Sequence, residues 1–189
     1  MGRIVVTEYV SLDGVMQAPG GGEDFQHAGW TFEIDRGEEG DKFKLDETLE
    51  SEALLLGRVT YEGFADAWPA REGEFADKFN TMPKYVVSST LKDPQWTNST
   101  VLDGDVDEAV SKLREEIDGD IVVHGSGQLV QALIDGDLVD ELRLMVFPVV
   151  LGAGKRVFGE TRDKKSFRLT DSRSVGEGVA IMIYQPTNA

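Results

Sequence analysis

The chain has 189 residues, of which 40% are hydrophobic, enough for one domain with a sizeable core. Its 35 acidic and 19 basic residues give a net charge of -16, which argues against nucleic acid as a partner. Cysteine is absent and only two histidines are present. Disulfides, thiolate metal ligands and a cysteine nucleophile are therefore excluded, and we expect no metal site.

No apolar stretch approaches the roughly 20 residues that cross a bilayer, and the N-terminus lacks the features of a signal peptide. We therefore expect a cytoplasmic protein without a membrane partner. The dispersed acidic residues form either an ordinary acidic surface or one adapted to a salty cytoplasm. Because the Debye length shrinks to about 3 Å at roughly 1 M salt, we expect affinity for an anionic cofactor to hold or improve as salt rises.

Strand and helix patterns alternate along the whole chain, which indicates a single α/β layer structure. Helical spacing covers residues 41–51, with apolar residues at 43, 45 and 49, and residues 105–117. We expect both helices to cover the sheet. The last two strands are separated by only a short glycine-containing turn, so they predict an antiparallel hairpin in an otherwise parallel sheet. Strands are expected near 3–10, 53–56, 84–88, 99–102, 120–124, 139–150, 166–173 and 178–184.

Three of the expected strands end in small or polar residues. One runs into residues 125–129, Gly-Ser-Gly-Gln-Leu, a glycine turn that opens a helix; the others end at residues 57–60 and 88–90. Glycine lets the backbone approach a ligand, and the first amides of a helix bind an anion such as pyrophosphate. At the carboxyl edge of an α/β sheet the three ends would line one crevice, although each is also compatible with an ordinary turn.

In this order and spacing the three segments resemble the dihydrofolate reductase superfamily, and more closely the reductase domain at the C-terminus of the bifunctional riboflavin-biosynthesis deaminase-reductase. Ser11-Leu12-Asp13-Gly14 and the Pro-x-x-x-Gly-x-Gly of residues 148–154 resemble the same branch. The resemblance covers almost the whole chain. It implies one domain over residues 1–189 with a dihydrofolate reductase-like three-layer α/β fold and a mostly parallel sheet of about eight strands.

The resemblance also implies an NADPH-dependent reductase in which Gly57, Arg58 and Thr60 meet the adenosine phosphates. A guanidinium pairs with a phosphate through two charge-assisted hydrogen bonds, so Arg58 beside the ribose 2'-phosphate would favour NADPH over NADH. For Ser89 and Thr90, a structural role in a turn or cap is an equal alternative. The further residues implied around the adenine ribose and the pyrophosphate are Ser88, Ser89, Thr90, Gly125, Ser126, Gly127, Gln128 and Leu129.

Hydride transfer also requires a proton for the reduced substrate. In the folate enzymes a carboxylate on the helix before the Gly-Arg loop helps to supply it, which indicates Asp41 or Asp46, although neither lies in a matching motif. Asp13 is the stronger candidate because it follows the first strand at the crevice edge, where it would bind substrate, although Asp-Gly is also a routine turn. Asp13 and Asp46 are our candidate catalytic residues.

The substrate is the least defined part of this interpretation. A Trp-x-x-Pro-x-Asp motif of true folate reductases is missing, and so is the deaminase half of the riboflavin enzyme. If the chain reduces the opened ribose of a phosphoribosylamino-pyrimidine, Lys155 and Arg156 would meet the substrate phosphate; otherwise they are a solvated loop pair. Residues 17–40 would lie over the substrate, and Trp30 and Phe32 would either stack on it or pack under the loop or at a subunit interface.

Three functions remain open: a reductase of riboflavin or pterin metabolism, a stand-alone NADPH reductase of another small carbonyl or imine, and a nucleotide-binding protein without turnover. A conventional dinucleotide-binding dehydrogenase is disfavoured, because Val130 occupies the position of its third glycine. The apolar stretch 142–151 and the resemblance together predict a homodimer, since obligate interfaces are usually apolar.

Overall fold

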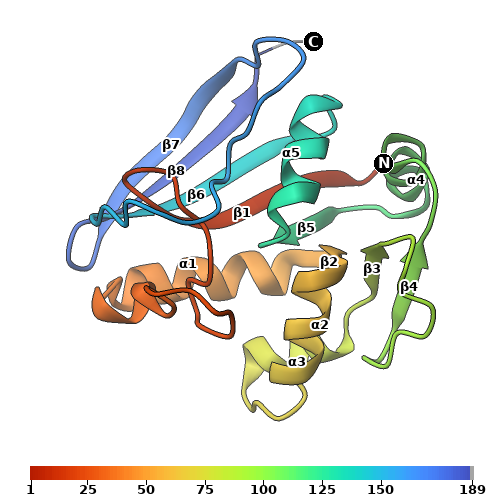
Figure 1. Cartoon of the computed structure of the whole chain (residues 1–189), viewed down its shortest axis with the longest axis horizontal. Coiled ribbons are helices and arrows are strands. Elements are labelled where there is room, and N and C mark those ends of the chain that lie inside the picture. The colour runs from red at the N-terminus through yellow and green to blue at the C-terminus, as the bar shows by residue number, and fades with distance from the viewer. Residues whose placement is uncertain (188–189) are drawn as a thin grey trace.

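The computed structural model describes residues 1–187 and joins eight strands in one sheet, in the order β4-β3-β2-β5-β1-β6-β8-β7 (Figure 1). β8 runs antiparallel to both of its neighbours, and the other pairings are parallel. This confirms the expected sheet and its C-terminal hairpin. The strands are β1 (Arg3–Ser11), β2 (Ser51–Gly57), β3 (Lys84–Val87), β4 (Ser99–Leu102), β5 (Asp120–His124), β6 (Glu141–Phe147), β7 (Phe167–Val175) and β8 (Val179–Pro186).

Helices cover both faces of the sheet and complete three layers (Figure 1). On one face, α4 and α5 contribute aliphatic side chains to the largest cluster of buried residues. On the other face, α2 and α3 contribute aromatic side chains, and α1 crosses below the central strands. The helices are α1 (Gly37–Glu50), α2 (Arg58–Ala67), α3 (Glu74–Thr81), α4 (Val106–Glu116) and α5 (Gly127–Asp135), with a 3-10 turn η1 at Trp30–Glu33.

The face that α1 turns to the sheet is polar, contrary to the expectation that its residues 43, 45 and 49 would cover the sheet. Its buried residues are Gly40, Lys44, Glu47 and Thr48, while the three apolar positions are only partly buried. The reason is electrostatic, because the sheet presents buried charged groups to this helix, as described below. The spacing of the apolar residues therefore predicted the helix correctly, but it did not predict which face of the helix is buried.

Two helices, α2 and α3, were not expected from the sequence. Neither has a side-chain cap at its N-terminus, α2 contains Gly63, and α3 is only 8 residues long. Helices shorter than about 12–15 residues are marginal on their own. Here tertiary contacts stabilise them, since Trp68 stacks on Phe75 at a centroid distance of 5.2 Å and Phe79 packs 4.8 Å from Trp68.

The apolar stretch 142–151, which suggested a homodimer, lies mostly within or against the core of this chain. Leu142, Leu144, Met145 and Phe147 are all buried in the core of this chain, whereas Val150 is exposed. The pattern is therefore explained by the central position of β6 and no longer argues for a second subunit.

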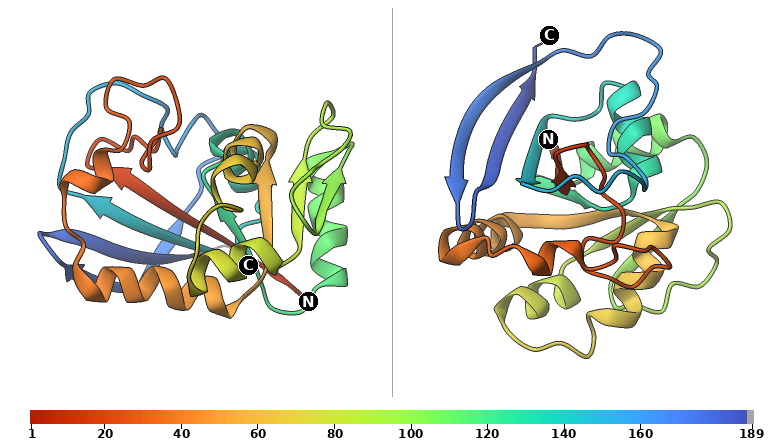
Figure 2. Two further views of the ribbon diagram at one scale, coloured as in Figure 1. Left: turned by 90° about the horizontal axis from the view of Figure 1, so that it is seen from below. Right: turned by 60° about the vertical axis from the view of Figure 1, so that its left-hand side comes forward.

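The parallel strands bring their carboxyl ends to the same edge of the sheet, where long loops gather. The loop after β1 lies beside the loop after β6, and Val15 pairs with Arg156 in an isolated bridge (Figure 2). Across residues 1–187, no helix combines the length and the apolarity needed to cross a membrane.

Candidate functional site

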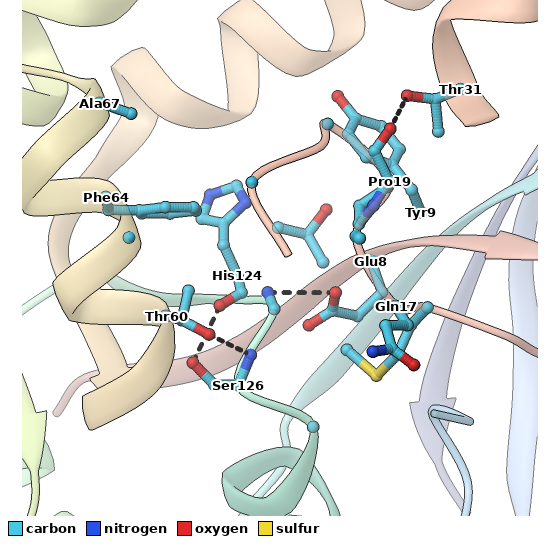
Figure 3. A pocket seen from close by; sticks show the side chains of 18 of the residues that line it. Glu8, Tyr9, Gln17, Pro19, Thr31, Thr60, Phe64, Ala67, His124 and Ser126 are labelled. Carbon is cyan, nitrogen blue, oxygen red and sulfur yellow. Dashed lines mark hydrogen bonds between the residues drawn. The ribbon is translucent and has the colours of Figure 1, made fainter. Parts of the chain in front are cut away.

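A cavity of 2170 Å³ opens at the carboxyl edge of the sheet (Figure 3). Its walls come from the ends of β1, β2, β3 and β5, from the first turns of α2 and α5, from α1, and from the loop that follows β1. Ligand pockets usually measure about 300–1000 Å³. The volume is therefore sufficient for a dinucleotide and a small second molecule together.

The structure brings all the predicted cofactor residues to this cavity, although they come from three separate segments of the chain. Each of the three segments follows a different parallel strand. Their proposed contacts with a cofactor remain predictions. The lining includes Gly57, Arg58, Thr60, Ser88, Ser89, Thr90, Gly125, Ser126, Gly127, Gln128 and Leu129.

The loops that open α2 and α5 are tied to each other by Ser126. Its hydroxyl accepts a hydrogen bond from Gly57 N at 2.9 Å, and its amide donates to Thr60 Oγ1 at 2.8 Å. Ser126 has a φ of 57°, in the left-handed region that a side chain rarely adopts. The two helix N-termini are therefore held side by side at the cavity in a backbone conformation that these bonds maintain.

Not all the amides assigned to an anion are free to bind one. Gly125 N donates to Glu8 Oε2 at 3.1 Å, and Ser126 N is bonded to Thr60. The first helical bond of α5 runs from Val130 N to Ser126 O at 2.9 Å. The three amides that precede this bond, and can face an anion, belong to Gly127, Gln128 and Leu129.

Arg58 begins α2 and is paired with Glu62 one turn further on, at 2.8 Å. Both side chains are about half exposed, so the pair is weak and Arg58 can turn to a phosphate at small cost. The hydroxyl of Ser88 accepts from the amides of Thr90 and Leu91 at 3.2 and 2.9 Å. The segment 88–90 therefore forms a turn at the cavity wall that is closed by the Ser88 hydroxyl.

The structure does not place Asp13 in the cavity lining of the described residues. Its carboxylate accepts hydrogen bonds from Ser11 Oγ at 2.6 Å, Leu151 N at 3.1 Å and Gly152 N at 2.9 Å. The Ser11 hydroxyl, followed by the Leu151 amide, lowers the pKa of Asp13 to about 2. Asp13 thus connects the loop after β6 to the end of β1. With its lowered pKa it is a carboxylate at neutral pH, whereas a proton donor must be the protonated acid.

The acids considered on α1, Asp41 and Asp46, are exposed and paired with basic residues. Asp46 forms an exposed i,i+4 pair with Lys42 and is also absent from the described cavity lining. Asp41 does line the cavity, but its side chain is exposed and pairs with Arg36 at 2.6 Å. Both are ordinary surface carboxylates of an acidic helix.

Two titratable residues in the lining were missed in the sequence, Glu8 on β1 and His124 at the end of β5. They are 4% and 8% exposed, and neither Glu8 Oε1 nor His124 Nε2 has a hydrogen-bond partner among the described residues. Burial raises the pKa of Glu8 well above its usual value. Burial, followed by the charges of Lys44 and Arg143, lowers the pKa of His124 well below its usual value. Glu8 could have been noticed in the sequence, because it is a charged residue within the mostly apolar stretch from Ile4 to Val10.

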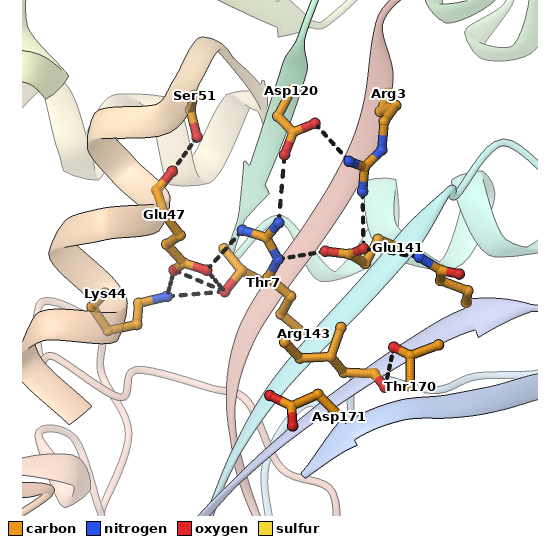
Figure 4. Close-up of polar contacts among 12 residues, drawn as sticks. Arg3, Thr7, Lys44, Glu47, Ser51, Asp120, Glu141, Arg143, Thr170 and Asp171 are labelled. Atoms are coloured by element: carbon orange, nitrogen blue, oxygen red, sulfur yellow. Dashed lines mark hydrogen bonds and ion pairs between the residues drawn. The ribbon is translucent and has the colours of Figure 1, made fainter. Parts of the chain in front are cut away.

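A buried ionic network lies between α1 and the sheet (Figure 4). Lys44 pairs with Glu47 and donates to Thr7 Oγ1 at 2.9 Å. Arg143 on β6 lies 3.6 Å from Glu47 and 2.7 Å from Glu141. These contacts explain why α1 buries charged residues and why Lys44 lies at the cavity wall.

The loop between β1 and α1 lines the cavity with several of its residues, as expected for a cover. Trp30 is buried and packs on Phe147 under the loop, whereas Phe32 is 79% exposed and lines the cavity. Lys155 and Arg156 also line it. Lys155 pairs with Glu23 at 2.9 Å, and Arg156 donates to the Asp13 carbonyl, so both basic residues already hold loops together.

The model of the RibD C-terminal domain family matches residues 3–181. The chain belongs to this family. Its match extends from the first residues of β1 into β8, so the whole cavity lies within the RibD C-terminal domain.

Proteins of known sequence or structure are similar to this chain over almost their full length. YyaP of Bacillus subtilis (strain 168) is 26% identical, with 96% of this chain and 94% of YyaP covered. A putative riboflavin biosynthesis protein from Shewanella sp. PV-4 has a TM-score of 0.79 at 20% identity, with 98% and 99% of the two chains covered. Dihydrofolate reductase from Enterococcus faecalis, solved with NADP(H), has a TM-score of 0.60 at 16% identity, with 98% and 97% covered. The fold of this RibD C-terminal domain is therefore dihydrofolate reductase-like.

Proposed function

We propose that the protein is an NADPH-dependent reductase that transfers hydride to a C=N or C=O group of a small substrate, as in the reduction of a phosphoribosylamino-pyrimidine in riboflavin biosynthesis. One observation carries the proposal: the N-termini of α2 and α5 converge with Arg58 on one large cavity. Membership of the RibD C-terminal domain family supports reductase chemistry in this cavity.

The residues present fit the cofactor. The amides of Gly127, Gln128 and Leu129 offer donors at the positive end of α5 for a pyrophosphate, and Arg58 offers a guanidinium for the ribose 2'-phosphate. Bound NADPH supplies the hydride. The protein then has to orient the substrate, exclude water and provide a proton.

The test of the proposal is a titration with NADPH and, separately, NADH. Wild-type protein should bind NADPH more tightly, and R58A should weaken NADPH by about 10- to 100-fold, the equivalent of one or two charge-assisted hydrogen bonds, with NADH nearly unchanged. R168A is the matched control, because Arg168 is exposed on β7 and lies outside the cavity lining. Equal losses for both cofactors would assign Arg58 another role, and no binding of either would refute the proposal.

A second experiment addresses the substrate. A strain that lacks the riboflavin-pathway reductase should grow without added riboflavin when it expresses this chain. Growth only with riboflavin, together with NADPH binding by the purified protein, would point to another carbonyl, imine or pterin substrate or to nucleotide binding without turnover.

A further inference from the structure

We propose that Glu8 is the proton donor of the reaction: it enters the reaction as a neutral carboxylic acid and protonates the substrate atom that becomes electron-rich when hydride adds to its neighbour. The inference rests on the proposed function. It assigns the proton to a residue of β1, a central strand of the sheet, in place of the predicted candidates. Of these, Asp13 holds a loop and Asp46 forms an exposed ion pair.

The position of Glu8 is the first argument. Alternate residues of a strand face opposite sides of the sheet. Thr7 contacts Lys44 of α1, and Tyr9 contacts Arg36, the residue just before that helix. Glu8 therefore faces the other way, toward the loop that opens α5, where Gly125 N donates to its Oε2. Glu8 thus lies directly beside the loop to which we assign the cofactor pyrophosphate, at the wall of the same cavity.

The second argument is the missing partner of Oε1. This oxygen is shielded from solvent and no described residue bonds to it. An unsatisfied buried polar atom is costly, and in native proteins it calls for an explanation such as a catalytic role or a bound group. One oxygen of Glu8 is therefore fixed by the backbone, and the other is left for a group that the protein itself does not contain.

The third argument is the absence of a counter-charge. Glu8 forms no ion pair within residues 1–187, because the nearby ammonium of Lys44 is already paired with Glu47 and bonded to Thr7. Burial raises the pKa of Glu8 and the charge of Glu47 adds to this, while Lys44 and the Gly125 amide oppose it without cancelling it. The raised pKa favours the neutral acid, which is the form that the proposed role requires.

His124 is the other unpartnered group facing the cavity, but it does not suit this role. Burial, followed by the positive charges of Lys44 and Arg143, lowers its pKa well below the usual value, which favours the neutral imidazole. Phe79 packs against its ring at 5.2 Å. His124 can accept or donate a hydrogen bond to substrate, while the acid is Glu8.

Hydride, with its electron pair, forms a C–H bond at the substrate carbon, and the π electrons of the C=N or C=O bond move to the nitrogen or oxygen. The proton of Glu8 forms the new N–H or O–H bond, and Glu8 becomes a carboxylate near Lys44. A proton from solvent restores the acid for the next turnover, so one NADPH and one proton are consumed.

The first measurement is made on the protein without ligands. Infrared spectra of the wild-type protein with isotope-labelled glutamate carboxyls should show one neutral glutamic acid at neutral pH, and E8Q should lack its signal. E141Q should keep the signal, because Glu141 is also buried but forms ion pairs with Arg3 and Arg143. Fully ionised glutamates in the wild-type protein would overturn the proposal, and this measurement does not depend on any variant folding.

The second measurement uses NADPH and the phosphoribosylamino-pyrimidine. E8Q should lower kcat by about 100-fold or more with little change in KM, and E8D should recover part of the loss. The wild-type kcat should fall as pH rises through the pKa of Glu8, and that dependence should disappear in E8Q. An E8Q enzyme with the wild-type kcat would overturn the proposal. If wild-type protein does not bind NADPH at all, the proposed function fails instead, and the infrared result still decides whether Glu8 is a neutral acid.

Discussion

Asp13 shows how a carboxylate in a family motif can serve the loops around a site instead of the reaction. Its oxygens accept the Leu151 and Gly152 amides, which belong to a different loop 138 and 139 residues further along the chain. An acid suits this position, because a neutral side chain could not accept from both amides and from the Ser11 hydroxyl with equal strength.

This role predicts a pH dependence. The folded-state pKa of Asp13 is lowered to about 2 from 3.8, so its contribution to loop order is present above pH 3.8 and is lost as pH falls through the folded-state value. The amide proton shifts of Leu151 and Gly152 should therefore titrate together near pH 2 in NMR spectra. D13N should expose both amides to faster hydrogen exchange. Unchanged exchange in D13N would mean that other contacts hold the loop.

The cavity residues that belong to sequence motifs could be predicted, whereas Glu8, the proposed proton donor, could not. Gly57, Arg58 and the segment 125–129 stand next to recognisable strand ends, so their common location follows from sheet topology alone. The environment of Glu8 depends on Lys44 being paired elsewhere and on an amide 117 residues away. Such long-range pairing determines a pKa but leaves no periodic signal in the sequence.

At the scale of elements, Lys84 joins α3, β3 and the segment before β4. It is fully buried, and its ammonium donates to the carbonyls of Asn80, Met82 and Thr97 at 2.9–3.0 Å, above the ring of Trp96. The carbonyls of Asn80 and Met82 lie at the C-terminal end of α3, where no further helical turn supplies backbone amides to bond them. Lys84 therefore acts as the C-terminal cap of a helix that is too short to be stable by itself.

We expect K84M to destabilise the protein strongly, by about 1–3 kcal/mol for each carbonyl left unpaired. Urea unfolding measures the change, and K112M is the matched control because Lys112 is exposed on α4. A loss equal to that of the control would show that the three carbonyls find other partners. Because α3 also carries Phe79 against His124, K84M should weaken the cavity wall as well.

The strand pattern was predicted almost completely, whereas the helices at the cavity were predicted only in part. Strands in a parallel sheet are apolar on both faces and stand out as short runs. The helices α2 and α3 depend on contacts of Trp68, Phe75 and Phe79 with one another, and α1 buries charges in place of its apolar positions. In each case tertiary contacts outweighed local periodicity.

For the whole molecule, a net charge of -16 opposes the approach of a polyanionic cofactor. Salt screens this repulsion, and it also weakens the exposed pair between Arg58 and Glu62, which releases Arg58 for a phosphate. We predict that the Kd of NADPH stays constant or falls from low to high salt. In E62Q, binding at low salt should be tighter and the gain from salt smaller. A wild-type Kd that rises at every step would contradict this.

The position of β7 at the end of the sheet has a consequence for behaviour in concentrated solution. An edge strand offers unpaired backbone groups to other molecules and so invites aggregation. Along β7, however, Arg168, Asp171 and Arg173 are exposed, and the pairing with β8 shifts register between Leu169 and Asp171. Charges and an irregular edge both obstruct the addition of a further strand. Because the irregular shape does not depend on long-range repulsion, this protection persists at salt concentrations that screen the negative charge of the molecule.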